Sequence, residues 1–417
     1  MLVKEAAVSR CPFRPPTTDL VDPVLYSSGA APAVWRDMST LDRLHWQQVD
    51  ADRGFWSVVT YAEADQVLRD TDTFTSERGT LIDLLGTDDP AGGQQLAVTD
   101  PPLHTRRQAR LKRALTNKAV DQQRETIRSL VLELLEPLGE GGVFDFGRAM
   151  MAMPMWVTGT MMGLPRSDWE WLTRITTMCI AADDPEYQDP DGKDATLKKA
   201  HLELFCYFQD VVGHRRDHLG DDLLSVLMST RFEGRTMSPG EVISNCYSLL
   251  LGANVTTPHA PTFVMAELPG SGVLEDWARH PELNKSAYEE ALRWASPVNH
   301  VMRYATSDTV LRGTPVAAGE AVVVWLGGAN RDERVFADAH TFDIRRRPNK
   351  HLAFGIGPHY CVGHSVARVT LGILFEELLG RYENFALAAR PERLISTFAS
   401  GYKHVPVTAR RRSNPAR

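Results

Sequence analysis

Apolar residues recur at helical spacing along most of the chain. Side chains three and four residues apart form apolar faces in several long segments, and this period predicts helices. The predicted helices span residues 61–70, 102–116, 119–138, 147–162, 166–181, 193–217, 239–267, 284–295 and 361–379. Strand-like segments are few: a run split by turn residues at 310–325, the segments 386–389 and 404–409, and a hairpin near 56–59. The pattern therefore predicts a mainly α-helical fold with small β-sheets at its margins.

Two stretches rich in Gly, Asp and Pro interrupt the helical pattern, at 76–98 and 182–193, and they predict mobile surface loops. We find no internal repeat and no polar linker that would separate independent parts. The sequence therefore predicts one domain over residues 1–417, with 1–20 as a flexible N-terminal arm and 410–417 as a basic tail.

Composition narrows the class of protein. The 417 residues include 46 Lys and Arg against 53 Asp and Glu, a net charge of −7, and 43% of them are hydrophobic. That balance is typical of a globular protein with a large core, and it argues against nucleic acid as the main partner.

The cysteines and the N-terminal segment indicate the compartment. Five cysteines are present without any C-x-x-C pair, so neither a disulfide framework nor a zinc knuckle is indicated. They are Cys11, Cys179, Cys206, Cys246 and Cys361. The first residues lack the apolar stretch of a secretory signal, and no segment is apolar over about 18 residues. A cytoplasmic protein without a membrane anchor is expected.

One cysteine lies in a distinctive setting. Residues 351–364 read HLAFGIGPHYCVGH and precede an apolar helical run. Glycines at 355 and 357 permit a tight turn with positive φ, which would place Cys361 at a helix N-terminus. Backbone N–H groups and the helix dipole favour a thiolate there. The alternative for a single cysteine is a buried structural thiol.

This segment resembles the F-G-x-G-x-H-x-C-x-G motif of the cytochrome P450 family, whose cysteine thiolate is the proximal ligand of haem iron. The matching positions are Phe354, Gly355, Gly357, His359, Cys361 and Gly363. The resemblance implies the single triangular-prism domain of that family and haem b (iron protoporphyrin IX) bound through Cys361. It also implies cofactor contacts at Phe354 and Gly355, with Gly363 letting the helix approach the porphyrin closely.

Other segments extend the resemblance. Glu290 and Arg293 stand three residues apart on a predicted helix, where such a pair is usually a solvated surface pair. Their position upstream of the cysteine resembles the family's buried E-x-x-R, which implies a structural role.

Three residues match positions that contact the haem propionates in the family: Arg303, His104 and His359. An arginine supplies a charge-assisted hydrogen bond to a carboxylate. Gln108 departs from the pattern, because the family usually carries a second propionate-binding arginine there. One alternative is that Arg107 substitutes for it.

The helix expected on the oxygen side of the haem carries a second departure. Residues 252–257 align with the family's small-Gly-x-acid-Thr segment, and Val255 occupies the place of the acid. The resemblance makes Thr256, Asn254 and Thr257 candidates for a proton relay, completed by water or by the substrate. Alternatively, Val255 only packs and water carries the protons. Pro258 and Pro261 lack N–H groups, which predicts a kink in this helix.

The resemblance implies that the segment before Arg303 lines the substrate pocket, where the polar groups of Asn299 and His300 would orient a polar aromatic or acidic ligand. Alternatively, these side chains face solvent or satisfy backbone groups. The resemblance adds Val255, Ala253 and Phe398 to this pocket. The 76–98 loop would form its lid.

Electrons must come from a separate protein, because the sequence suggests no fused reductase. The resemblance implies a ferredoxin or flavodoxin with its reductase, and no nucleic acid or membrane partner, for a monomeric enzyme. A basic proximal face would attract an acidic donor. Its candidates are Arg106, Arg107, Arg110, Lys112 and Arg113, unless they form an ordinary charged helix face.

The resemblance implies a dioxygen-dependent enzyme of bacterial type that tailors secondary metabolites such as antibiotics. Hydroxylation of a polar aromatic or other secondary metabolite is the leading hypothesis. The alternative is oxidative aryl C–C coupling or ring closure of a phenolic or indolic precursor, since such a substrate can supply its own protons and electrons. A third hypothesis is a haem-containing binding or sensor protein without turnover.

Overall fold

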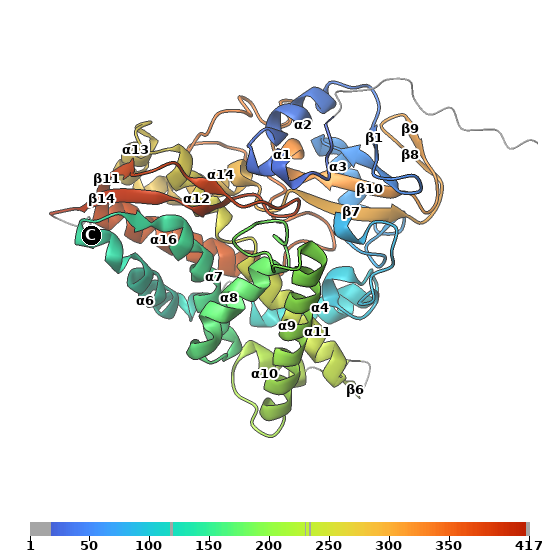
Figure 1. Cartoon of the computed structure of the whole chain (residues 1–417), viewed down its shortest axis with the longest axis horizontal. Helices are drawn as coiled ribbons and strands as arrows, with labels where there is room; N and C mark the ends of the chain where they lie inside the picture. The colour runs from blue at the N-terminus through green and yellow to red at the C-terminus, as the bar shows by residue number, and fades with distance from the viewer. Residues whose placement is uncertain (1–17, 117–119, 230, 233–234, 414–417) are drawn as a thin grey trace, which may run out of the picture.

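The computed structural model describes residues 18–116, 120–229, 231–232 and 235–413. Cys11, most of the predicted N-terminal arm and the end of the predicted basic tail lie outside these residues. Helix is the main secondary structure of the described chain (Figure 1). Within it, no helix is both long enough and apolar enough to cross a membrane.

The helices follow the predicted pattern closely. They are α1 (Pro23–Ser27), α2 (Ala31–Ser39), α3 (Tyr61–Arg69), α4 (Leu103–Ala114), α6 (Arg124–Leu135), α7 (Phe146–Met162), α8 (Trp169–Met178), α9 (Lys193–Arg215), α10 (Leu223–Ser229), α11 (Pro239–Asn254), α12 (His259–Glu267), α13 (Val273–Arg279), α14 (Asn284–Ala295), α15 (Leu326–Ala329) and α16 (His364–Arg381). The sequence pattern missed the short helices, among them α2, α10 and α13, because two turns of helix carry little periodic signal.

The largest sheet lies at one side of the molecule, at the upper right in Figure 1. Its five strands run in the order β1-β2-β10-β7-β3, and only β10 and β2 pair in parallel. The strands are β1 (His45–Gln48), β2 (Gly54–Val58), β3 (Phe74–Thr75), β7 (His300–Ala305) and β10 (Ala321–Trp325). The predicted hairpin near 56–59 is confirmed as β1 and β2. The strand β7 was missed because nearly all of its side chains are buried, so its sequence lacks the period-two alternation of a half-exposed strand.

Small strand groups complete the margins. The run at 310–325 forms the hairpin β8 (Thr309–Leu311) and β9 (Thr314–Val316) before β10, and the C-terminal segments form β11 (Tyr382–Leu387), β13 (Tyr402–His404) and β14 (Pro406–Arg411), as predicted. Four further short strands are β4 (Phe144–Asp145), β5 (Arg231–Phe232), β6 (Arg235–Thr236) and β12 (Glu392–Arg393). Strands β11, β14 and β4 make a three-stranded sheet.

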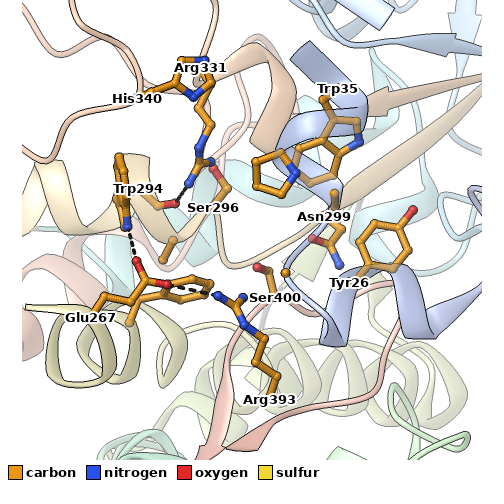
Figure 2. Close-up of a pocket in the computed structure, with 15 residues that line it drawn as sticks. Tyr26, Trp35, Glu267, Trp294, Ser296, Asn299, Arg331, His340, Arg393 and Ser400 are labelled. Carbon is orange, nitrogen blue, oxygen red and sulfur yellow. Dashed lines mark hydrogen bonds and ion pairs between the residues drawn. The ribbon is translucent and has the colours of Figure 1, made fainter. Parts of the chain in front are cut away.

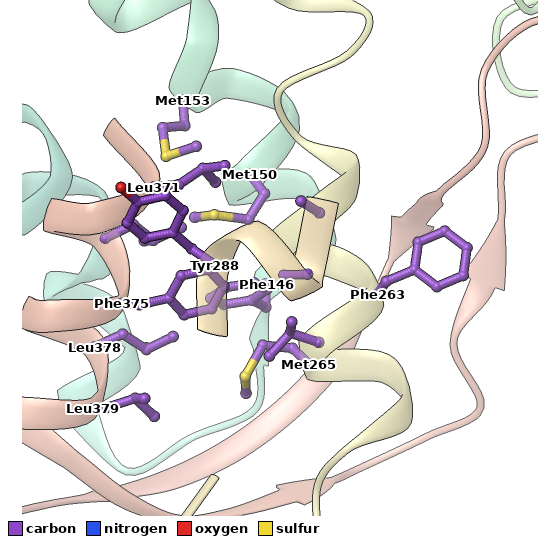
Figure 3. Close-up of a cluster of buried hydrophobic side chains, with 14 of the residues drawn as sticks. Phe146, Met150, Met153, Phe263, Met265, Tyr288, Leu371, Phe375, Leu378 and Leu379 are labelled. Carbon is purple, nitrogen blue, oxygen red and sulfur yellow. The ribbon is translucent and has the colours of Figure 1, made fainter. Parts of the chain in front are cut away.

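The main hydrophobic cluster joins α6, α7, α12, α14 and α16. Figure 3 shows its side chains converging from several of these helices, with Met150 and Phe146 of α7 and Leu371 and Phe375 of α16 fully buried. A second cluster joins α7, α8, α9 and α11. Val366 of α16 packs against both clusters. Val362 of the cysteine segment packs against the second cluster, as Leu251 of α11 does. The cores therefore hold α11 and the start of α16 in fixed positions.

The helix predicted at 239–267 is interrupted, as the prolines indicated. It begins with a capping box, in which Ser238 and Glu241 bond each other's backbone N–H groups, and its first part ends at Asn254. Pro258 and Pro261 cannot donate to the carbonyls of Asn254 and Thr257, so the helical hydrogen-bond ladder breaks there and α12 starts at His259. The predicted kink is confirmed.

Glu290 and Arg293 form a buried ion pair, so the surface alternative for this pair is wrong. Arg293 Nη2 and Nε donate to the Glu290 carboxylate at 2.7 and 2.8 Å, and both side chains are 0% exposed. Arg346 donates to the same carboxylate from the 330–346 segment. The pair therefore joins α14 to the chain that leads to the cysteine segment.

The two loops predicted at 76–98 and 182–193 are each anchored by a few buried side chains. The 76–98 loop contains two short 3-10 helices and buries Ile82, Leu85 and Leu96. In the 182–193 loop, Asp184 is fully buried and pairs with Lys403 at 2.7 Å. Their Gly, Asp and Pro residues shape turns, while a few apolar or charged side chains anchor each loop.

Candidate active site

The cysteine segment forms the turn that its glycines predicted. Gly355 and Gly357 have φ of +67° and +76°. The Cys361 N–H donates back across the turn to the Phe354 carbonyl at 2.9 Å, and α16 begins three residues later. Glycine is required at position 357 for two reasons. Its φ is positive, and a Cβ there would lie 2.7 Å from the Leu68 carbonyl oxygen.

Hydrogen-bond donors and a cation beside Cys361 offset part of the effect that burial has on its thiol. The backbone N–H groups of Gly363 and His364 hydrogen-bond to its sulfur, and the Arg368 guanidinium lies nearby. Burial raises the pKa of the Cys361 thiol, while these donors and the cation lower it. The Cys361 side chain is accessible, although many protein atoms surround it.

The other described cysteines lack this setting. Burial raises the pKa of Cys179 to about 12 and raises that of Cys246 even more strongly, which keeps both thiols neutral. Cys206 is exposed on α9. Cys361 is therefore the thiol suited to bind a metal.

The predicted propionate contacts come together from three segments. His104 on α4 and His359 have ring centroids 4.3 Å apart. His104 is 2% exposed, and its Nδ1 has no hydrogen-bond partner. Burial, together with the charges of His359 and Lys112, lowers the pKa of His104 to about 4. An orphaned polar atom in this position fits a missing acidic partner.

Arg303 fits the same partner. It is 4% exposed on β7 and donates to the Met302 carbonyl, and no described carboxylate lies within ion-pair distance of it. Burial lowers the pKa of Arg303 to about 10, against the attraction of Asp100. A buried cation without an anion is costly, so the propionates of a haem would stabilise it. Together with the Cys361 donors, these residues fit the group that the family binds.

Asp100 belongs to this cluster, although the sequence analysis did not single it out. Its carboxylate accepts hydrogen bonds from Ser76 and Thr75 and lies 3.4 Å from His359 Nε2. Burial raises the pKa of Asp100, but the bonds from His359, Ser76 and Thr75 outweigh this and hold it well below its usual range. Asp100 therefore orients His359. The signal was available, because Asp100 begins the same D-P-P-x-H-T-R segment as His104.

Arg107 and Gln108 point to different neighbours. Gln108 Nε2 lies 3.5 Å from the Pro358 and Tyr360 carbonyls of the cysteine segment. Arg107 is buried, donates to carbonyls of the 76–98 loop and pairs with Glu241 of α11 at 3.1 Å. The structure thus joins Arg107 to the 76–98 loop and to α11.

Burial also removes Arg107 from the predicted basic face. Arg106 and Lys112 are exposed on α4, whereas the side chains of Arg110 and Arg113 lie outside the described part. The exposed part of this face that the structure describes is therefore Arg106 and Lys112.

Asn254, the last residue of α11, and the two threonines that follow the helix have different partners. Thr256 Oγ1 donates to the Gly252 carbonyl at 2.7 Å, and Thr256, Thr257 and Ala253 are partly exposed. Asn254 is 3% exposed and donates to Thr176 Oγ1 of α8 at 3.1 Å. Its amide is held between helices, so the structure does not bring it together with the threonine hydroxyls. Val255 is buried, which agrees with the packing alternative.

Asn299 and His300 hydrogen-bond to backbone groups, which was the alternative to a role in ligand binding. Asn299 Nδ2 donates to the Thr397 and Ala399 carbonyls at 3.1 and 3.3 Å. His300 Nδ1 bonds the Thr397 carbonyl, and its Nε2 accepts from the Ile82 N–H at 3.1 Å. Burial lowers the pKa of His300 to about 4. His300 therefore fastens the 76–98 loop and Thr397 to β7, Asn299 bonds the 397–399 segment, and neither side chain is free to orient a ligand. Phe398 is partly exposed beside His300.

Comparison with known proteins agrees with this geometry. The family model described as Cytochrome P450 matches residues 274–398. Cytochrome P450 NovI of Streptomyces niveus is 30% identical over 396 residues, covering 93% of this chain and 95% of NovI. Steroid C26-monooxygenase of Mycolicibacterium smegmatis is 30% identical over 375 residues, covering 87% of this chain and 86% of that enzyme. Among solved structures, P450 OxyD, involved in the biosynthesis of vancomycin-type antibiotics, superposes with a TM-score of 0.83 at 30% identity, covering 94% of this chain and 100% of OxyD.

Proposed function

Because the chain belongs to the cytochrome P450 family and is a haem-containing monooxygenase, we propose that it hydroxylates a polar aromatic secondary metabolite with dioxygen. The relatives NovI and OxyD support a place in natural-product tailoring, since OxyD takes part in the biosynthesis of vancomycin-type antibiotics. We further propose that the enzyme is a cytoplasmic monomer.

The observation that carries the proposal is the setting of Cys361. Two backbone N–H groups bond to its sulfur, while His104 and Arg303 present a buried orphan nitrogen and an unpaired cation. Cys361 would hold the iron, and the two basic residues, with His359, would hold the propionates. When bound, the haem supplies the activated oxygen for insertion into an unreactive C–H bond.

Protons are handled by this chain's hydroxyl groups. Thr256 donates its own proton to the Gly252 carbonyl, which leaves its oxygen lone pairs available to accept a hydrogen bond. Neither Val255 nor the enclosed Asn254 supplies an acid beside it. We therefore assign proton delivery to Thr256, Thr257 and water or a polar group of the substrate.

Val255 also favours the second candidate function, oxidative coupling or ring closure of a phenolic or indolic precursor. A coupling reaction removes hydrogen from the substrate itself, so it depends less on a protein carboxylate at this position. The two functions differ in their products, because hydroxylation adds one oxygen atom and coupling removes two hydrogens without adding oxygen.

Electrons would come from a ferredoxin or flavodoxin with its reductase. Lys112 and Arg106 on the exposed face of α4 provide positive charge for an acidic donor. Reduction rates that fall steeply with ionic strength would support this docking mode, and rates independent of salt would contradict it.

The first test is the absorption spectrum of the reduced protein with carbon monoxide. Wild-type protein and Cys206→Ala, an exposed-thiol control, should give the long-wavelength Soret band of thiolate ligation, and Cys361→Ala should lose it. Retention of that band in Cys361→Ala would refute the ligand assignment. Titration with polar aromatic metabolites, followed by turnover under isotopic dioxygen, then separates hydroxylation from coupling by product mass.

A further inference from the structure

A cavity of about 230 Å³ lies apart from the residues assigned to the haem (Figure 2). Its walls come from the N-terminal helices α1 and α2, from α12, from the end of α14 and from the C-terminal segment near Arg393 and Ser400. Cys361, His104 and Thr256 do not line it. Asn299, whose amide is held by the 397–399 segment, forms part of its wall.

The cavity presents a cation without a matching anion. Arg331 Nη2 donates to the Trp294 carbonyl at 2.6 Å and Nη1 lies 3.3 Å from the Gly327 carbonyl. Throughout the described chain, no carboxylate lies within ion-pair distance of Arg331. Burial, with Arg293 nearby, lowers the pKa of Arg331 to about 10, so it still carries its charge at neutral pH. An unpaired and largely desolvated charge is stabilised by an anion.

The other ionisable side chains that line the cavity, apart from Arg331, carry almost no net charge. Arg393 pairs with Glu267 at 3.0 Å, and Glu267 also accepts from Trp294 Nε1 at 2.8 Å. Burial and nearby arginines lower the pKa of His340, which is therefore neutral at pH 7. Two guanidinium groups against one carboxylate leave a single excess positive charge. A monoanion would neutralise it.

The other walls favour an aromatic ligand. Trp294 stands on one side of the cavity and Tyr26 and Trp35 on the other, as Figure 2 shows. Ser400 lines the cavity, and its hydroxyl bonds no group within the described part of the chain. The volume is smaller than the roughly 300–1,000 Å³ typical of pockets for drug-sized molecules, so the ligand is small.

We propose that this cavity is a second binding site, for a small aromatic monocarboxylate. Arg331 bonds its carboxylate, Ser400 offers a further polar contact, and the aromatic walls hold its ring. The site is independent of the haem ligands, so its test does not depend on the proposed reaction.

The test is calorimetric titration of the full-length haem-loaded protein with benzoate while 4-phenylimidazole saturates the haem iron. Benzyl alcohol and benzylamine serve as neutral and cationic analogues of the same size. Benzoate should bind despite the azole, and both analogues should bind at least about tenfold more weakly, since they lack the charge-assisted bond.

Two variants locate the site. Arg331→Gln removes the cation, and Ser400→Leu fills the cavity while both arginines remain. Each should weaken benzoate binding about tenfold or more. Arg279→Gln, which removes an exposed guanidinium on α13, should bind benzoate like the wild type.

Thermal unfolding of each unliganded variant reports its folding. If Arg331→Gln does not fold, the benzoate affinity of Ser400→Leu tests the proposal by itself. Wild-type affinity in Ser400→Leu, or loss of benzoate binding when the azole is added, would overturn the proposal. The second outcome would assign the binding to the haem pocket.

Discussion

Cys361 and Cys246 differ in role because the backbone around their thiols differs. Cys246 is buried and Cys361 is accessible, yet the surrounding protein raises the pKa of each thiol. Only Cys361 has two backbone N–H groups on its sulfur, because it sits in the glycine turn before α16. Cys246 lies in the middle of α11, where helical N–H groups bond to helical carbonyls. The role of each cysteine thus follows from its place in the secondary structure.

Val255 provides a prediction at the same scale. Under the hydroxylation proposal, Val255→Glu supplies the missing acid, and the yield of product per electron pair should rise by about tenfold, which is less than the roughly 10²–10⁴-fold that a fully positioned general acid supplies. Product and consumed reductant are measured together. The control is Val255→Gln, which matches the shape of glutamate without a titratable proton.

Two results would count against an incomplete relay. Equal gains in Val255→Glu and Val255→Gln would indicate repacking at a position that is only 3% exposed. An unchanged yield in Val255→Glu, with an intact carbon monoxide spectrum, would favour protonation by the substrate and so the coupling alternative.

At the scale of elements, the buried pair of Glu290 and Arg293 joins α14 to the 330–346 segment. Arg293 also donates to the Asn330 and Ala339 carbonyls at 2.9 Å, and Arg346 shares the Glu290 carboxylate. One carboxylate therefore neutralises cations from two elements. Removing it leaves both arginines buried without an anion.

Glu290→Gln should therefore lower the free energy of unfolding by about 3–5 kcal/mol and reduce haem retention. Urea unfolding followed by fluorescence measures the first effect and the Soret absorbance measures the second. Glu133→Gln is the matched control, because it breaks a pair with Arg166 in which both side chains are more than half exposed. A control of this kind should change stability by less than about 1 kcal/mol. Equal effects of the two variants would contradict the structural role of the buried pair.

At the scale of the whole molecule, His404 ties together segments far apart in sequence. Its Nδ1 lies 2.5 Å from Asp145, which caps α7, and its Nε2 lies 2.9 Å from Glu186 in the 182–193 loop. Burial lowers the pKa of His404, but the hydrogen bonds to Asp145 and Glu186 outweigh this and raise it above its usual value. The protonated ring is thus more stable in the folded state than in the unfolded chain.

This link predicts a pH dependence. Because the folded pKa is the higher one, the stabilisation is fully present below the unfolded pKa and is lost as the pH rises through the folded pKa. The melting temperature of the wild type should exceed that of His404→Gln by about 2 °C at pH 5.5, and the gap should shrink by pH 8.5. His218→Gln, an exposed histidine after α9, should show no such gap. A gap that widens with pH would contradict the assignment.

The family and its fold were predictable from the sequence, and both are confirmed. The reason is local: the cysteine turn depends on residues within ten positions of one another, with Gly355 and Gly357 at positive φ and Cys361 before α16. The kink at Pro258 is equally local, since proline removes a hydrogen bond wherever it stands in a helix. That residues 1–417 form one domain stays a prediction.

Side-chain direction and long-range packing were decided only by the tertiary structure. Asn254 was placed with the threonines, yet it bonds Thr176 of another helix. His300 was placed in the substrate pocket, yet its two nitrogens fasten segments more than 90 residues away on either side. A helix or strand pattern states which residues share an element, whereas the partner of a buried polar group depends on which other element packs against it. The sequence by itself therefore determined the family, the glycine turn before Cys361 and the kink, and the packing of distant segments decided which polar residues remain free for chemistry.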